Sequence, residues 1–170
     1  MKTTPILFLA AALIAGGCQS AQSSSAPTKS GNVTVNFHEA DKFTDVRETF
    51  GGNASQQYLD ILSQHLQRKA AALLPPGQQL TVTFTDIDLA GDFLPMKASM
   101  QDVRVIKDIY IPHMSLSFKI TDADGKVIKE GSRKLTDMNF MNNLGLIGRN
   151  QPLFYDKALL DDWVQKELKS

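Results

Sequence analysis

The stretch from Gly77 to Phe93 (GQQLTVTFTDIDLAGDF) constrains the fold more than any other part of the sequence. Its first half alternates apolar and polar residues, which is typical of a β-strand with one buried face. At Asp86 the alternation changes phase, because Ile87 and Leu89 now occupy the apolar positions. A strand that keeps one core face cannot absorb this change without an extra residue. The sequence therefore predicts a β-bulge or a bend near Thr85 and Asp86.

Apolar residues at helical spacing predict a first amphipathic helix before this strand. Asn53 and Gln56 have the spacing of a capping box at its start, and Pro75 ends it. An alternating strand begins at Val33, so the order strand, helix, strand predicts a βαβ unit.

A second amphipathic helix is predicted at the end of the chain. Its apolar face includes Trp163, which we expect to anchor the helix in the core. Asp156 is expected to lie away from that face, together with Asp161, Asp162 and Lys166. With a hairpin turn at 122–125 and a basic edge strand at 127–136, the sequence predicts one α+β domain. We expect a mixed sheet of about four to five strands with the two helices packed on it.

The first 31 residues predict export and anchoring. Ten apolar residues at 6–15 follow Lys2, a run that suits a secretory signal peptide and is shorter than the about 20 residues of a membrane-spanning helix. Small residues then lead to Cys18, the only cysteine, in a pattern that resembles a bacterial lipoprotein box. We predict a signal peptide at 1–17, lipidation of Cys18 with acyl groups such as palmitate, a flexible tether at 18–31 and the folded domain at 32–170. A plain signal peptide with a chance cysteine is the alternative.

Charge and motifs narrow the function. The chain has 18 basic and 18 acidic residues, and this balance argues against a nucleic-acid-binding protein. The sequence contains no GxSxG, P-loop, HExxH or dinucleotide-binding motif. We therefore predict that the protein is not an enzyme, and we assign it no catalytic residues and no cofactor. Gln19 after the cysteine resembles lipoproteins that are exported to the outer membrane, which would place the domain in the periplasm.

Asp86, Asp88 and Asp92 are the candidate ligands for a hard cation. Their spacing is not that of an EF-hand, and carboxylates that accept bonds from turn amides explain the same residues. We therefore assign no metal ligands and expect amides near Gly91, or the side chain of Arg104 or Lys107, to satisfy Asp86 and Asp88. The three histidines, at 38, 65 and 113, show no ligand spacing.

Three segments resemble a proteobacterial family known as domain of unknown function 3016. They are LLPPGQQLTVTFTDIDLAGD, DVRVIKDIYIPHMSLSFKITDADGKVIKEGSRKLTDMNF and YDKALLDDW, within a likeness that extends from about Val33 to Trp163. The resemblance implies an exported envelope protein and carries no catalytic residues with it. Our leading hypothesis is a lipid-anchored, non-enzymatic module that binds an envelope protein or another envelope component. The alternative is a small-molecule or divalent-metal-binding periplasmic protein that uses the acidic segment Asp86–Asp92, and an unrecognised hydrolase is a third hypothesis.

Overall fold

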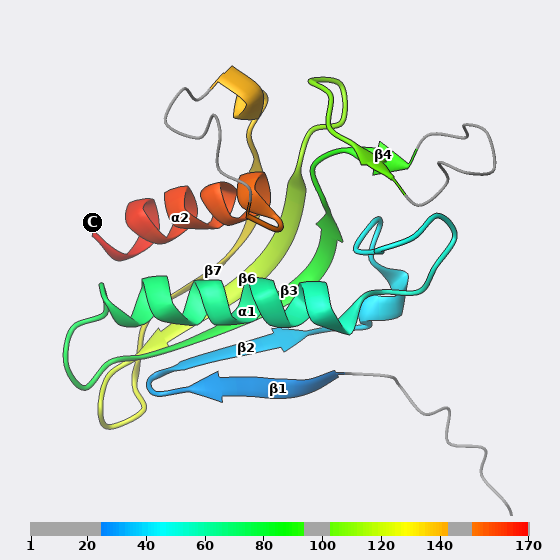
Figure 1. Ribbon diagram of the computed structural model, residues 1–170. Coiled ribbons are helices and arrows are strands. Elements are labelled where there is room, and N and C mark those ends of the chain that lie inside the picture. Colours follow the sequence, from blue (N-terminus) through cyan, green and yellow to red (C-terminus); the bar gives the residue numbers. More distant parts are fainter. Residues whose placement is uncertain (1–24, 94–102, 143–150, 170) are drawn as a thin grey trace, which may run out of the picture.

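The computed structural model describes residues 25–93, 103–142 and 151–169 (Figure 1). The elements in chain order are β1 (Ser25–Ser30), β2 (Val33–Phe37), η1 (Ala40–Lys42), α1 (Gln56–Ala71), β3 (Gln79–Asp88), β4 (Asp92–Phe93), β5 (Arg104–Val105), β6 (His113–Thr121), β7 (Val127–Thr136), η3 (Phe140–Asn142) and α2 (Phe154–Leu168).

The main sheet has five strands in the order β1-β2-β3-β6-β7, and β4 and β5 form a small second sheet. Strands β2 and β3 are parallel, whereas the other neighbours in the main sheet are antiparallel. The sheet is therefore mixed, and the predicted α+β class is confirmed. The parallel pair flanks α1 in sequence, so the predicted βαβ unit is also confirmed.

Both long helices cover the same face of the main sheet (Figure 1). The core lies between these two layers, because the buried residues of the strands and helices form one cluster. Its aromatic contacts include the stacked rings of Phe37 and Phe84, whose centroids are 5.5 Å apart. Trp163 is 4% exposed and packs edge-on against Phe118, so its predicted place in the core is confirmed.

The predicted bulge is present in β3. The pairing of β3 with β6 shifts register between Phe84 and Asp86, which leaves Thr85 as the extra residue. Phe84 and Ile87 are both fully buried, and the two residues between them are at least partly exposed. The bulge thus keeps the apolar residues on the helix-covered side and turns Thr85 and Asp86 to the other side.

Helix α1 begins two residues later than the capping box implied. Its N-cap is Ser55, whose side chain accepts a hydrogen bond from the amide of Tyr58 (3.1 Å). The Ser55 amide donates to the carbonyl of Val46 (2.8 Å), so a loop contact fixes the start of the helix. The assignment of Asn53 as the N-cap was wrong, because a tertiary contact selects the competing serine.

The predicted tether at 18–31 is too long. Residues Ser25–Ser30 form β1, which pairs antiparallel with β2. This strand satisfies the backbone groups on the outer side of β2, and its Thr28 carbonyl also accepts a hydrogen bond from Gln67 (2.7 Å). Residues 18–24 lie outside the described residues, as do the predicted signal peptide and Cys18.

Helix α2 is fixed to the sheet by an ionic contact as well as by its apolar face. The Glu167 carboxylate lies 3.0 Å from Lys129 Nζ and 2.9 Å from an Arg133 guanidinium nitrogen, both on β7. Within the described ranges, no helix has the length and apolar character needed to cross a membrane.

Candidate functional site

The face of the main sheet opposite the helices carries short polar side chains. On β3 the outward positions are Thr81 and Thr83, and on β6 the corresponding positions include Ser117. Ser117 pairs with Thr83 on one side and with Ser132 of β7 on the other. A row of hydroxyl groups therefore crosses three strands on the uncovered face.

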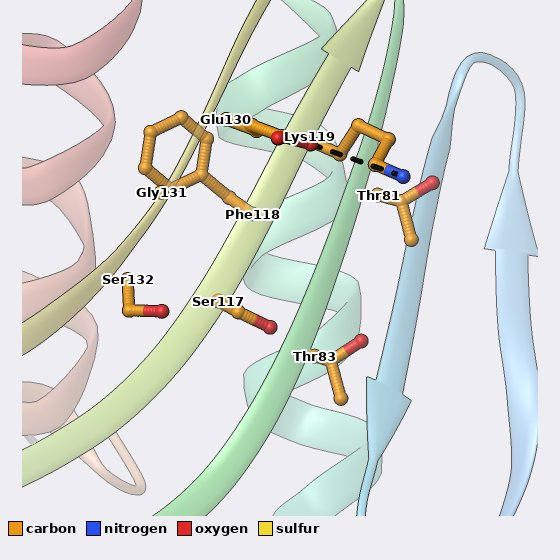
Figure 2. Close-up of a pocket in the computed structure, with 8 residues that line it drawn as sticks. All are labelled: Thr81, Thr83, Ser117, Phe118, Lys119, Glu130, Gly131 and Ser132. Atoms are coloured by element: carbon orange, nitrogen blue, oxygen red, sulfur yellow. Dashed lines mark ion pairs between the residues drawn. The ribbon is translucent and has the colours of Figure 1, made fainter. Parts of the chain in front are cut away.

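These short side chains leave a hollow of about 580 Å³ between longer neighbours. We call it the hydroxyl groove; it is lined by Thr81, Thr83, Ser117, Phe118, Lys119, Glu130, Gly131 and Ser132. Figure 2 shows the hydroxyl-bearing side chains on the side of the sheet away from α1, whereas the Phe118 ring points away from them. Its volume is within the usual range of ligand pockets, about 300–1,000 Å³.

The groove contains hydroxyl groups with unused hydrogen-bonding capacity. Thr81, Ser117 and Ser132 make no side-chain hydrogen bond within the part of the chain that the structure describes. The Thr83 hydroxyl accepts a bond from Asn36 Nδ2 (3.3 Å) and retains its own proton for donation. Lys119 and Glu130 stand at one end as an ion pair with an N–O distance of 3.9 Å.

A second hollow, of about 210 Å³, adjoins the hydroxyl groove and shares Ser117 and Ser132 with it. It continues along the strands to Thr85, Ser115 and Lys134. The Thr85 hydroxyl there donates to the carbonyl of Ser115 (3.3 Å). The polar surface thus extends from the groove to the bulge.

Beyond the bulge the same sheet leads to an acidic pocket of about 290 Å³, which Asp45, Asp88 and Asp92 line together with Arg47 and His113. Burial raises the pKa of Asp88 to about 6, and the nearby Asp45 carboxylate adds to the rise. Asp88 makes no side-chain hydrogen bond or ion pair among the described residues. Its carboxyl group is therefore the unpaired acid of this pocket.

The three candidate aspartates have different roles. Asp86 accepts hydrogen bonds from the amide (2.8 Å) and the hydroxyl (3.0 Å) of Thr44, and Asp92 accepts one from the amide of Phe93 (2.7 Å). The expected partners of Asp86 and Asp88 were wrong, because Thr44 from the loop after η1 satisfies Asp86. Within the described ranges, no group of three or more His, Cys, Asp or Glu residues could hold a metal ion.

Arg104 instead binds Asp45, a residue that the sequence analysis did not select. Its guanidinium lies 2.9 Å from Asp45 Oδ2 and also donates to the carbonyls of Gly91 (2.9 Å) and Arg47 (3.0 Å). Burial raises the pKa of Asp45, but the hydrogen bonds and charge of Arg104 outweigh it and leave the pKa lowered. This largely buried pair joins β5 to the loops around the acidic pocket and has a structural role.

Asp156 is buried, at 2% exposure, so the expectation that it lies away from the core was wrong. Its carboxylate accepts a hydrogen bond from the amide of Ala90 (3.0 Å) and connects the start of α2 to the end of β3. Burial raises its pKa to about 6 against the lowering effect of that bond. The helical spacing indicates that Asp156 lies on the buried face of α2, since it precedes Leu160 by four residues and Trp163 by seven.

The histidines are not brought together. His65 lies between the helices, with Nε2 2.7 Å from Asp161 Oδ1, and burial lowers its pKa. His113 lines the acidic pocket and pairs in register with Asp88, whereas His38 lies 3.6 Å from Glu39 at the end of β2.

The hydroxyl groove was not predicted from the sequence. Its signal was the outward half of the alternating pattern, in which threonine occupies positions 81, 83 and 85 of β3 and serine occupies positions 115 and 117 of β6. Such residues fit any solvent-facing strand, so only the pairing of β3, β6 and β7 shows that they form a continuous surface.

Comparison with known proteins assigns the chain to a family. No curated protein matches the sequence significantly. Among solved structures, the chain is similar to a minor lipoprotein from Acinetobacter baumannii at 14% identity and a TM-score of 0.26, over 65% of this chain and 81% of that one. The family described as "protein of unknown function (DUF3016)" matches residues 31–166. The chain therefore belongs to the DUF3016 family, as its sequence resemblance indicated.

Proposed function

We propose that this protein is a lipid-anchored envelope lipoprotein that acts as a non-enzymatic binding module. The observation that carries the proposal is the hydroxyl groove, a hollow of about 580 Å³ on the face of the sheet that neither long helix covers. The short side chains of Ser117 and Ser132, between longer neighbours, create this hollow. It offers the hydroxyl groups of serine and threonine to a ligand, and the two charged residues of its lining, Lys119 and Glu130, form an ion pair with each other.

The lipid anchor is supported by the sequence around Cys18. Cys18 is seven residues before the start of β1 at Ser25, a separation of at most about 25 Å in an extended chain. A lipidated Cys18 would hold the domain close to a bilayer. We place that bilayer at the outer membrane, facing the periplasm, because Gln19 follows the cysteine.

Site-specific photo-crosslinking in intact cells tests the binding role. A benzophenone side chain replaces Ser132 in the groove, and the matched control replaces Gln64, an exposed residue of α1. We expect a crosslinked species from position 132 that is absent from position 64. Equal products from both positions, or none from position 132, would refute the groove as the binding surface.

The alternative function, small-molecule or divalent-metal binding by the segment Asp86–Asp92, rests on the unpaired carboxyl group of Asp88. Calorimetric titration with Ca²⁺ and Mg²⁺ tests its metal form. A saturating signal that Asp88→Ala abolishes would favour the alternative, whereas we expect neither cation to give such a signal.

A further inference from the structure

We propose that the ligand of the hydroxyl groove is an uncharged oligosaccharide. This inference rests on the proposed function and names the chemical class that its binding surface accepts. It follows from the hydrogen-bonding groups in the groove, from their charge and from the position of the aromatic rings.

The hydrogen-bonding groups of the groove match a ligand that both donates and accepts. A hydroxyl group offers one donor and two acceptor positions. Thr81, Ser117 and Ser132 have all of these available within the described residues, and Thr83 keeps its donor. Sugar hydroxyl and acetamido groups are also both donors and acceptors, so they can satisfy these residues in either direction.

The charge of the groove excludes strongly ionic ligands. Lys119 and Glu130 are the charged residues of its lining, and they neutralise each other at 3.9 Å. Their side chains are 53% and 62% exposed, so they stand at the rim (Figure 2). A polyanion would require a run of basic groups along its path, whereas the adjoining hollow adds only Arg133, which binds Glu167, and Lys134.

The groove also lacks the anchors of a protein interface. Such interfaces depend on buried aromatic and arginine residues at their centre. The single aromatic residue of the lining, Phe118, is 3% exposed, and its ring packs against Trp163 on the helix side. Arg133, beside the groove, binds Glu167 of α2. A polar ligand that needs no apolar anchor fits these facts better than a folded partner.

The length of the surface suits a short chain of sugars. The hydroxyl groove and the adjoining hollow extend from Lys119 to Ser115 along β6, which is about 13 Å at strand spacing. Binding should be weak, with a Kd on the order of 1 mM, because a few solvent-accessible hydrogen bonds contribute little each. Attachment to a membrane would offset this weakness by raising the local concentration of the domain beside its ligand.

The test is a titration followed by nuclear magnetic resonance, with the full chain in detergent micelles. The probes are a tetrasaccharide of N-acetylglucosamine and maltotetraose, which separate a glycan that carries amides from one with hydroxyl groups alone. We expect at least one of them to shift the amide signals of Thr83, Ser117 and Ser132 with saturation. Saturation by either tetrasaccharide supports the proposal. The one that binds more tightly shows whether the groove prefers a glycan with acetamido groups or one with hydroxyl groups alone.

Three variants locate the site. Ser117→Ala removes one hydroxyl group and should weaken binding by about 2- to 12-fold. Ser117→Gln fills the hollow with a longer uncharged side chain and should abolish the shifts. Ser30→Gln makes the same kind of change at an exposed serine of β1, outside the groove, and should leave binding unchanged.

The outcomes separate this inference from the proposed function. If neither tetrasaccharide shifts the groove signals at 10-fold above the expected Kd of about 1 mM, while the crosslinker at Ser132 captures a protein, the groove binds and the oligosaccharide assignment is wrong. Binding that is confined to a sulfated oligosaccharide and vanishes with added salt would also overturn it. If the crosslinker captures nothing above the control, the proposed function itself fails.

Discussion

Replacement of Asp156 by asparagine should stabilise the protein at neutral pH. Asp156 is 2% exposed, and burial raises the pKa of its carboxyl group from 3.8 to about 6. The folded state therefore holds a proton that the unfolded state has already lost between these two pH values. By linkage, the contribution of this group is most favourable below pH 3.8 and declines as the pH rises to about 6.

The rise from 3.8 to about 6 sets the magnitude. At about 1.36 kcal/mol for each pKa unit, it corresponds to about 3 kcal/mol at pH 7. Asparagine cannot ionise, yet its oxygen can still accept the bond from the Ala90 amide. Its amide group has two N–H donors that need acceptors, one more than the O–H group of the neutral acid, so the gain in stability stays below the full value. We expect Asp156→Asn to match the wild type near pH 4 and to exceed it by up to about 3 kcal/mol at pH 7.

Urea unfolding at intervals from about pH 4 to pH 8 measures the difference between the two proteins. Contributions from other carboxyl groups cancel in this difference, provided that the m-value is unchanged. Asp162→Asn, on the exposed side of the same helix, is the control and should show little effect. An Asp156→Asn variant that is less stable at pH 7 would refute the reasoning. It would show that the carboxylate is stabilised in its charged form by the amides at the start of α2.

Further predictions concern the anchor, the core and the bulge. Cys18→Ala should abolish labelling by a fatty-acid analogue and release the chain from membranes; an unlabelled, soluble wild type with a free thiol would exclude the anchor. Trp163→Ala should cost about 3–5 kcal/mol in thermal unfolding, because its indole is in the core. Asp86→Ala should cost about 0.5–1.5 kcal/mol, because its bonds to the exposed Thr44 are replaced by bonds to water, whereas Asp88→Ala should be neutral or stabilising at pH 7. Equal losses from both aspartates in urea unfolding would contradict this difference.

The parts of the fold that depend on local periodicity could be predicted. The phase change at Asp86 located the bulge. Side chains of a strand alternate between its two faces, so apolar residues on both sides of a phase change can face one core only if the strand contains an extra residue. The apolar stripe that contains Trp163 located α2 for the same kind of reason. The fold class followed from the order of these elements.

The parts of the structure that depend on contacts between residues far apart in the sequence could not be predicted. Strand β1 carries no apolar alternation, since its role is to pair with β2 at an edge of the sheet. The ion pair of Asp45 and Arg104 joins residues 59 positions apart. Asp156 was misplaced because its charge was given more weight than its helical position, and the Ala90 amide that satisfies it comes from another element.

The bulge also decides which part of the open face a ligand can reach. It turns Thr85 and Asp86 to the same side, so the hydroxyl surface gives way to a carboxylate surface within one residue. The carboxylates lie at the end of the sheet where β1 begins, because Ser25 pairs with Phe37 and Phe37 with Phe84. The hydroxyl groove lies farther along the same strands, so a ligand that lies along the hydroxyl surface meets the Asp86 carboxylate only beyond the bulge.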